Sequence, residues 1–355
     1  MAPGDSPIGS LPADQLHAAL RDLVTEAQEL NVGAVTELDQ VPTPLEFMRY
    51  VAQNRPFVVR GGARHWPART QWSNDHLRSI MGDQLVTVAI TPNGYADALV
   101  DGRFFVEPFQ KQMPFGEVVD ILEQKQAQRQ LTDSTARPPP KHYLAYHYYI
   151  QSQNGNIEGD YQRLKREIPA DIDFATEALG YRPDAVNFWM GEASSVTSLH
   201  KDPYENIYVV LAGSKTFTLY PPTECYCLYE RFYQAAEYHE EETASSPSSV
   251  PRLVLKPKDD HPDIPWVSVD PLDSSPETQV AHPRFHQLAR PLTVTVNSGD
   301  MLYLPALWYH HVQQRQDIRG RVIAVNYWYD MNYSAPLFPY FKFAQNIVAL
   351  VHPPK

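Results

Sequence analysis

The hydrophobic and polar positions of this chain follow two periods, which predict a β-rich protein flanked by helices. Apolar residues recur every three to four positions in residues 11–31 and 44–54, and this period predicts two N-terminal helices. Two more helices are expected, one beginning near Ser73 and one over residues 113–126. Runs of alternating or continuously apolar residues, typical of strands, occupy residues 55–62, 85–92, 142–154, 185–191, 207–212, 215–220, 301–312 and 321–330.

Two pairs of these strands are close enough in the sequence to predict hairpins. The first pair flanks a short turn at Gly213, which would place Val210 opposite Phe217. The second pair flanks a polar loop at residues 313–320. A β-rich fold with at least two hairpins is therefore expected.

The composition supports a folded protein of this kind. Hydrophobic residues make up 43% and aromatic residues 12% of the chain, which is typical of a globular protein rather than a disordered one. A length of 355 residues allows one large core or two modest ones. We expect one elaborated domain, because all-β barrels often exceed the usual domain size.

Net charge and cysteine content indicate which kind of partner the protein binds and in which compartment it resides. The formal net charge is −12, and an acidic protein binds phosphate backbones poorly, so a cationic protein or peptide is expected rather than nucleic acid. Cys225 and Cys227 are too few for a disulfide framework, and we expect reduced thiols in the cytosol or nucleus. The N-terminus lacks a signal-peptide pattern, and no apolar run reaches the ~20 residues of a membrane span, so no membrane association is expected.

His200 and Asp202 are the first candidates for chemistry. Residues two apart on a strand point to the same face, so an imidazole and a carboxylate would project side by side. Such a pair supplies two ligands of the 2-His-1-carboxylate triad that holds non-haem Fe(II). In the expected hairpin Asn206 and Lys215 share that face, and the lysine could hold the far end of a dicarboxylate co-substrate. The spacing alone also fits a satisfied polar pair without a metal.

The third metal ligand must come from another part of the chain. His310 lies on a strand of the second hairpin, from which it would face His200 across a barrel. His310 and His311 are adjacent, and only one of them can point inward on a strand. The residues alone leave a choice between them, although parity favours a shared face for His310 and Trp308.

Several motifs carry a resemblance to a known family. They are HKDPYENIY, GSKTFTLYPP, GDMLYLPALWYHHV and VNYWYD, preceded by RPFVVRGGARHWPA, YYIQSQNGN and PDAVNFWMGEASSVTSLHKD. This set resembles the Jumonji-C (JmjC) family of Fe(II)- and 2-oxoglutarate-dependent oxygenases, and is most similar to its subgroup of small lysyl hydroxylases. The motifs occur in order from about Asn31 to Asp330. The resemblance implies a mainly β fold with flanking helices, in which a double-stranded β-helix forms a jelly-roll, cupin-like barrel.

The resemblance also implies domain boundaries. Residues 1–30 would form an N-terminal helical segment, and residues 31–330 the oxygenase domain, with its barrel core at about 145–330. Residues 331–355 would form a C-terminal helical segment. Related hydroxylases form homodimers through C-terminal helices, so a homodimer is implied, with packing of this segment against its own barrel as the alternative. The acidic loop at 240–250 has no assigned role.

The metal ligands implied by the resemblance are His200, Asp202 and His310. The family pattern places the second histidine before a spacer and a valine, which selects His310 over His311. No catalytic residue beyond the metal centre is implied.

The residues that the resemblance implies for 2-oxoglutarate are Lys215, Thr197, Tyr149, Asn206 and Asn326. Tyr143, Tyr146 and Tyr148 remain alternatives to Tyr149. Trp308 and Trp328 could shape the substrate mouth, although core packing explains both equally well.

The implied reaction uses O2 to decarboxylate 2-oxoglutarate to succinate and CO2 while it hydroxylates a substrate C–H bond. The subgroup implies (3S)-hydroxylation of a lysine in a GTP-binding protein of the developmentally regulated family. Hydroxylation of another residue, N-methyl-lysine demethylation and cleavage of basic histone tails are the alternatives. A cupin-like binding module without catalysis is a further one.

Overall fold

The computed structural model describes residues 12–31, 33–130, 146–152, 155–241 and 252–351. Tyr143 and most of the acidic loop at 240–250 lie outside these ranges.

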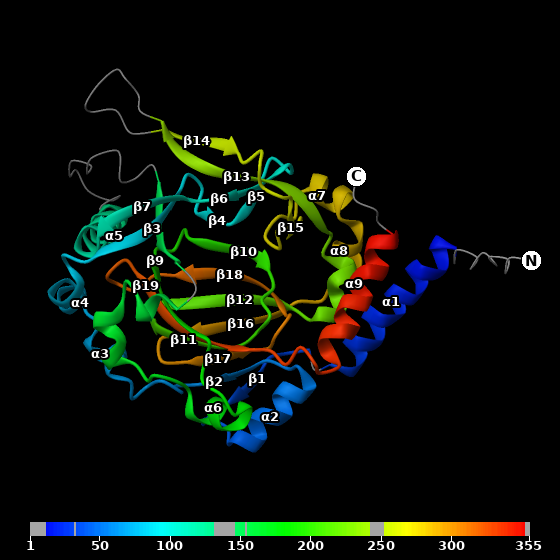
Figure 1. Cartoon of the computed structure of the whole chain (residues 1–355), viewed down its shortest axis with the longest axis horizontal. Helices are drawn as coiled ribbons and strands as arrows, with labels where there is room; N and C mark the ends of the chain where they lie inside the picture. Colours follow the sequence, from blue (N-terminus) through cyan, green and yellow to red (C-terminus); the bar gives the residue numbers. More distant parts are fainter. Residues whose placement is uncertain (1–11, 32, 131–145, 153–154, 242–251, 352–355) are drawn as a thin grey trace, which may run out of the picture.

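Two facing β-sheets form the centre of the described part of the molecule (Figure 1). The larger sheet contains, in spatial order, β1 (Thr36–Leu38), β2 (Phe57–Val59), β17 (Met301–Leu304), β11 (Tyr204–Ala212), β19 (Val322–Asp330), β9 (Ala185–Gly191), β8 (His147–Ile150), β3 (Leu85–Thr91) and β7 (Phe109–Pro114). The smaller sheet contains β16 (Leu292–Asn297), β12 (Ser214–Tyr220), β18 (Tyr309–Arg315), β10 (Val196–His200) and β4 (Tyr95–Ala96). Side chains of both sheets pack together in one hydrophobic layer, as expected for a jelly roll.

A third sheet lies beside the edge of the smaller sheet at β4 (Figure 1). Its strands are β5 (Ala98–Val100), β6 (Phe104–Glu107), β13 (Glu230–Glu241) and β14 (Arg252–Pro257), with β15 (Ile264–Val267) paired to β13. Phe105, Glu107 and Trp266 of this sheet line the same cavity as residues of the two central sheets. The third sheet therefore supplies one wall of that cavity.

Helices cover the outer face of the larger sheet and one end of the jelly roll. They are α1 (Ala13–Leu30), α2 (Pro44–Gln53), α3 (Pro67–Gln71), α4 (Asn74–Met81), α5 (Phe115–Gln130), α6 (Asp173–Leu179), α7 (Pro276–Ala281), α8 (Pro283–Leu288) and α9 (Leu337–Val351), with 3₁₀ turns η2 (Asn156–Glu158), η3 (Gln162–Glu167) and η4 (Pro222–Cys227). Helices α1 and α9 lie side by side and pack on η4 (Figure 1). None of the helices in the described ranges has the length and apolar character needed to cross a bilayer.

Strand β11 shows why both faces of the larger sheet are apolar. Ile207 and Val209 face outward into the layer under the helices, whereas Tyr208 and Val210 face inward toward the smaller sheet. A strand covered on both faces reads as a nearly continuous hydrophobic run, because neither face meets water. The prediction of a strand here is confirmed, but the apolar run did not reveal its partners.

The first expected hairpin is wrong. β11 pairs with β17 and β19, whereas β12 pairs with β16 and β18 in the other sheet. The chain turns a corner at Gly213, which has φ +70, and passes from one sheet to the sheet that faces it. Tyr208 and Phe217 consequently meet across the sandwich, with ring centroids 5.1 Å apart, instead of lying in neighbouring strands of one sheet.

The second expected hairpin is wrong for the same reason. β18 pairs with β10 and β12, and β19 pairs with β9 and β11, so the two strands lie in opposite sheets. His310 is the direct register partner of His200 in the smaller sheet. The two histidines therefore come from adjacent strands of one wall, not from opposite walls as expected.

Gly213 at this corner gives a stability prediction. A Cβ at position 213 would lie 2.6 Å from the Arg315 carbonyl oxygen, in addition to the strain of a positive φ. We expect Gly213→Ala to lower the free energy of unfolding by about 2–4 kcal/mol in chemical denaturation. Gly102→Ala is the matched control: its φ is +62 but no atom lies within 4 Å, so about 1 kcal/mol is expected. Equal losses for the two variants would contradict the proposed close contact.

Candidate active site

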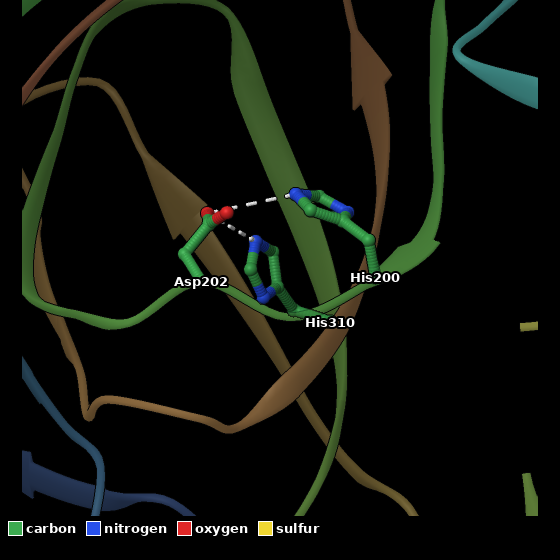
Figure 2. A group of neighbouring side chains, drawn as sticks. All are labelled: His200, Asp202 and His310. Atoms are coloured by element: carbon green, nitrogen blue, oxygen red, sulfur yellow. Dashed lines mark ion pairs between the residues drawn. The ribbon is translucent and has the colours of Figure 1, made fainter. Parts of the chain in front are cut away.

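Three side chains converge at one end of the smaller sheet (Figure 2). His200 ends β10, Asp202 follows it in the connection to β11, and His310 lies on the neighbouring β18. Their ligand atoms lie within 4.8 Å of one another, and the Asp202 Oδ2 atom is 3.6 Å from His200 Nε2 and 3.7 Å from His310 Nε2. These separations exceed a normal hydrogen bond but suit three ligands of one ion.

The backbone fixes which ring nitrogen each histidine offers. His200 Nδ1 lies 2.8 Å from the Ser198 carbonyl oxygen, and His310 Nδ1 lies 3.0 Å from the Trp308 carbonyl oxygen. A carbonyl can only accept, so each Nδ1 carries the proton and donates it. Both Nε2 lone pairs are therefore left facing Asp202, which is the arrangement that metal-binding histidines require.

Burial and mutual charge set the protonation of the three groups. Burial lowers the pKa of His310 to about 4, so its imidazole is neutral and able to bind a metal at neutral pH. Burial alone would raise the pKa of Asp202, but the facing imidazoles hold it below its ordinary value. Burial would also lower the pKa of His200, and the Asp202 carboxylate more than offsets this and raises it. The donor set fits a divalent cation such as Fe(II), because a half-buried carboxylate faces two imidazole lone pairs.

A β-bulge brings Thr197 into the same cavity as His200. Thr197 pairs with Val312 and His200 pairs with His310, so three steps along β10 match two steps along β18. In a regular strand Thr197 and His200 would point to opposite faces. The bulge removes this conflict, as bulges beside active sites commonly do, and both side chains line one cavity.

The cavity has a volume of about 580 Å³ and extends inward from the three converging side chains. Tyr149, Thr197 and Tyr208 line it, and Lys215 lies behind the two tyrosines, with its ammonium 5.4 and 5.7 Å from their ring centroids. Lys215 as a residue is 2% exposed, and its ammonium donates to the Tyr149 hydroxyl at 3.1 Å. Burial lowers the pKa of Lys215 to about 7. Lys215, Thr197 and Tyr149 are thus brought together as expected.

Gln314 completes the surroundings of Lys215 and was missed from the sequence. Its Oε1 accepts from the Lys215 ammonium at 2.8 Å, and its Nε2 donates to the Glu192 carbonyl oxygen at 2.6 Å. Since an ammonium has three donors, Tyr149 and Gln314 leave one for a ligand. Gln314 lies four residues after His310 on β18, and residues an even number of positions apart on a strand share a face. This spacing could have identified it from the sequence.

Asn206 and Asn326 come from neighbouring strands and meet in the cavity wall. Asn326 Nδ2 donates to Asn206 Oδ1 at 3.1 Å, and the Trp189 indole donates to Asn326 Oδ1 at 2.7 Å. Both asparagines are buried and line the cavity with Trp189. Trp189, which was assigned no role from the sequence, fixes the orientation of the amide pair.

The two tryptophans expected at the substrate mouth differ in position. Trp328 lines the cavity and stacks on Tyr204, with ring centroids 4.7 Å apart and planes 3° from parallel. Trp308 does not line it: its indole donates to the Asn54 side-chain oxygen at 2.7 Å and packs in the core between the sheets. Trp308 therefore belongs to the core and does not shape the mouth of the cavity, and core packing is the alternative that the structure supports.

The alternative tyrosines occupy other places. Tyr148 packs under the helices on the outer face of the larger sheet, and the Tyr146 hydroxyl accepts from the Leu253 backbone N–H at 3.1 Å. Tyr149 is the tyrosine of the described ranges that contacts Lys215 through its hydroxyl.

Comparisons with known proteins agree with this architecture. A family model described as a cupin-like domain matches residues 42–335. The human bifunctional peptidase and (3S)-lysyl hydroxylase JMJD7 is 38% identical, over 94% of this chain and 96% of its own. The JmjC domain-containing protein E of Dictyostelium discoideum is 36% identical, over 90% of this chain and 91% of its own. The lysine-specific demethylase JMJ32 of Arabidopsis thaliana is 35% identical, over 93% and 91%.

Proposed function

Because the chain belongs to the cupin-like JmjC family of 2-oxoglutarate-dependent oxygenases, we propose that it hydroxylates a lysine side chain of a protein substrate. The observation that carries this proposal is the convergence of His200, Asp202 and His310 at a cavity whose wall residue Tyr149 accepts a hydrogen bond from the buried Lys215 ammonium. A relative whose name specifies (3S)-lysyl hydroxylation supports lysine as the target. As the substrate we propose a GTP-binding protein of the developmentally regulated family.

The residues of the cavity divide between two tasks. His200, Asp202 and His310 would hold the iron through two Nε2 atoms and a carboxylate. When bound, iron, 2-oxoglutarate and O2 supply the oxidising chemistry that converts a C–H bond to an alcohol, with succinate and CO2 as coproducts.

The second task is to hold the dicarboxylate. The Lys215 ammonium and the neighbouring hydroxyls of Tyr149 and Thr197 are donors suited to its far carboxylate. The amides of Asn206 and Asn326, fixed by Trp189, would bind its metal-proximal end.

The test is incubation of the purified protein with Fe(II), 2-oxoglutarate and the GTP-binding substrate, followed by mass spectrometry of its lysine peptides. We expect one added oxygen atom on a lysine, dependent on both iron and 2-oxoglutarate. Succinate release without any modified lysine would leave the oxygenase in place and refute the substrate.

N-methyl-lysine demethylation is the second candidate, since a relative 35% identical is named a lysine-specific demethylase. The same incubation with an N-methylated lysine peptide distinguishes the two. Loss of a methyl group, with no oxygen added to the unmethylated peptide, would favour demethylation. Peptide cleavage without 2-oxoglutarate would instead favour the peptidase activity that the human relative's name includes.

The buried ammonium predicts how 2-oxoglutarate affinity depends on pH. In the free protein the pKa of Lys215 is about 7, so above that pH the amine is mostly neutral and must take up a proton to bind a carboxylate. Binding measured by calorimetry on the metal-loaded protein should weaken as pH rises above 7, approaching tenfold per pH unit, with net proton uptake. An affinity that is constant from pH 7 to about 9 would contradict this.

We infer a homodimer formed through α9, as the family resemblance implies. Tyr340, Phe343 and Leu350 of this helix are 63–73% exposed, which is unusual for large apolar side chains and supports a partner surface. Light scattering should give twice the chain mass, and Phe343→Asp should give the monomer.

We also infer residence in the cytosol or nucleus. The free thiols of Cys225 and Cys227 support this inference, and cell fractionation tests it.

A further inference from the structure

Asp97 has an unusual backbone conformation at the edge of the cavity. It follows β4, which runs parallel to β10 with Ala96 opposite Thr197, and both of these residues line the cavity. A regular strand would turn the next side chain to the other face of the sheet. Asp97 instead has φ +53, and its side chain lines the same cavity as that of Ala96. A positive φ at a non-glycine residue is costly, and such positions concentrate at functional sites.

The position of Asp97 relative to the metal ligands is fixed by β10. The Ser198 hydroxyl donates to the Asp97 carbonyl oxygen at 2.6 Å, two residues before His200. The Trp266 indole donates to the Ser198 hydroxyl at 3.3 Å, and its ring lies parallel to the His200 ring with centroids 5.8 Å apart. Asp97 therefore lies one strand away from His200, beside an aromatic wall.

The Asp97 carboxylate forms no ion pair with a lysine or arginine of the described ranges, and the His200 imidazole is the positive group whose charge favours its ionised form. Gln151 donates to its Oδ2 at 3.1 Å, and no described lysine or arginine pairs with it. Glu107, the other carboxylate in this part of the cavity, is paired with Lys258. Burial, and next the charge of Glu107, raise the pKa of Asp97 to about 6, which shows how little its ionised form is stabilised. A half-buried carboxylate without a lysine or arginine partner favours the arrival of a cation.

We propose that Asp97 accepts an N–H of the terminal ammonium of the substrate lysine and thereby distinguishes this side chain from one that has no N–H to donate. The proposal rests on the proposed function, and it assigns one recognition residue to it. From C3 to the nitrogen an extended lysine spans about 5 Å, given bond lengths near 1.5 Å. Neighbouring strands are about 4.8 Å apart, so a lysine with C3 near His200 can reach the next strand.

The surroundings of Asp97 favour an ammonium over other cations. Gln151 occupies one carboxylate oxygen and leaves the other for a single donor, whereas a guanidinium binds best to both oxygens. A trimethylammonium has no N–H to donate. Phe105 and Trp266, with ring centroids 4.6 Å apart, offer an apolar wall to the methylenes of the side chain.

The test compares two probes, Nα-acetyl-lysine methylamide and Nα-acetyl-norleucine methylamide, which differ at the terminal ammonium. Their affinities are measured by NMR titration of the full chain with Zn(II) and 2-oxoglutarate, so that no turnover is needed. We expect the wild type to bind the lysine probe at least about 10-fold more tightly, as for a desolvated charge pair. Asp97→Asn should bind both probes alike, and it keeps the backbone because asparagine tolerates a positive φ.

Asp101→Asn is the matched control, because Asp101 also has a positive φ, +54, but is exposed to solvent outside the cavity. It should keep the wild-type preference for lysine. A lysine preference retained by Asp97→Asn, or a wild type that binds the two probes alike, overturns the proposal. Iron-dependent succinate release by the wild type, measured separately, tells whether the proposed function stands when this inference fails.

Discussion

Replacing Asp202 with alanine is expected to abolish iron-dependent succinate release. The variant removes the carboxylate that lies 3.6 Å from His200 Nε2 and 3.7 Å from His310 Nε2, and leaves two neutral donors for the metal. Even the outer partners of metal ligands are worth about 10–100-fold in affinity or activity, so loss of a ligand should cost at least about 100-fold. The measured quantity is the succinate formed from 2-oxoglutarate, at an iron concentration that saturates the wild-type protein.

The control for this variant is Asp39→Ala, which removes an exposed carboxylate far along the chain from the three ligands. It should release succinate at the wild-type rate. Equal thermal unfolding midpoints for the two variants would show that lost activity is not lost folding. Succinate release retained by Asp202→Ala would refute the assignment of Asp202 as a ligand.

Replacing Lys215 with methionine is expected to have the second-largest effect, on the binding of 2-oxoglutarate. Lys215 is buried, with 2% of the residue exposed, so its ammonium meets a carboxylate with little competition from water. Truncating one partner of a buried charge pair costs about 2–5 kcal/mol, which corresponds to a KM for 2-oxoglutarate raised roughly 30-fold or more. Methionine fills similar volume and removes the charge, so the cavity should keep its shape.

The KM should change far more than the iron affinity, because Lys215 contacts Tyr149 and Gln314 rather than the metal ligands. Lys256→Met removes an exposed ammonium and should leave the KM unchanged. A Lys215→Met enzyme with the wild-type KM would show that the far carboxylate binds elsewhere.

Most elements could be predicted from the sequence because their periods are local properties. The N-terminal helices, the strand of β11 and the strand of β12 all lie where the pattern predicted them. Strand pairing could not be predicted, because it depends on partners far away in the chain. Two segments joined by a two-residue turn looked like a hairpin, yet Gly213 turns the chain between facing sheets.

The strands that carry Lys215 and Asn206 still face each other, in spite of this error, for a physical reason. Parity within each strand decides which side chains face inward, and both strands present their inner faces to the space between the sheets. The prediction of side-chain direction from odd and even positions failed where the backbone is irregular. The bulge between Thr197 and His200 and the positive φ of Asp97 each reverse a side chain, and neither leaves a signal in the pattern of apolar residues.

The sequence also could not show which of the two tryptophans, Trp308 and Trp328, packs in the core and which lines the cavity. Trp308 and Trp328 share parity with candidate site residues, but the structure places one against Asn54 and the other in the cavity wall. The local sequence around an aromatic residue gives its face, not its neighbours.

The central claim is that one metal ion is held jointly by His200, Asp202 and His310. The most direct measurement is the iron content of the protein after anaerobic reconstitution with Fe(II) and removal of free metal, compared with a variant in which all three residues are alanine. We predict one iron per chain in the wild type and none above background in the variant, with both proteins folded. Equal iron in the two proteins would contradict the account.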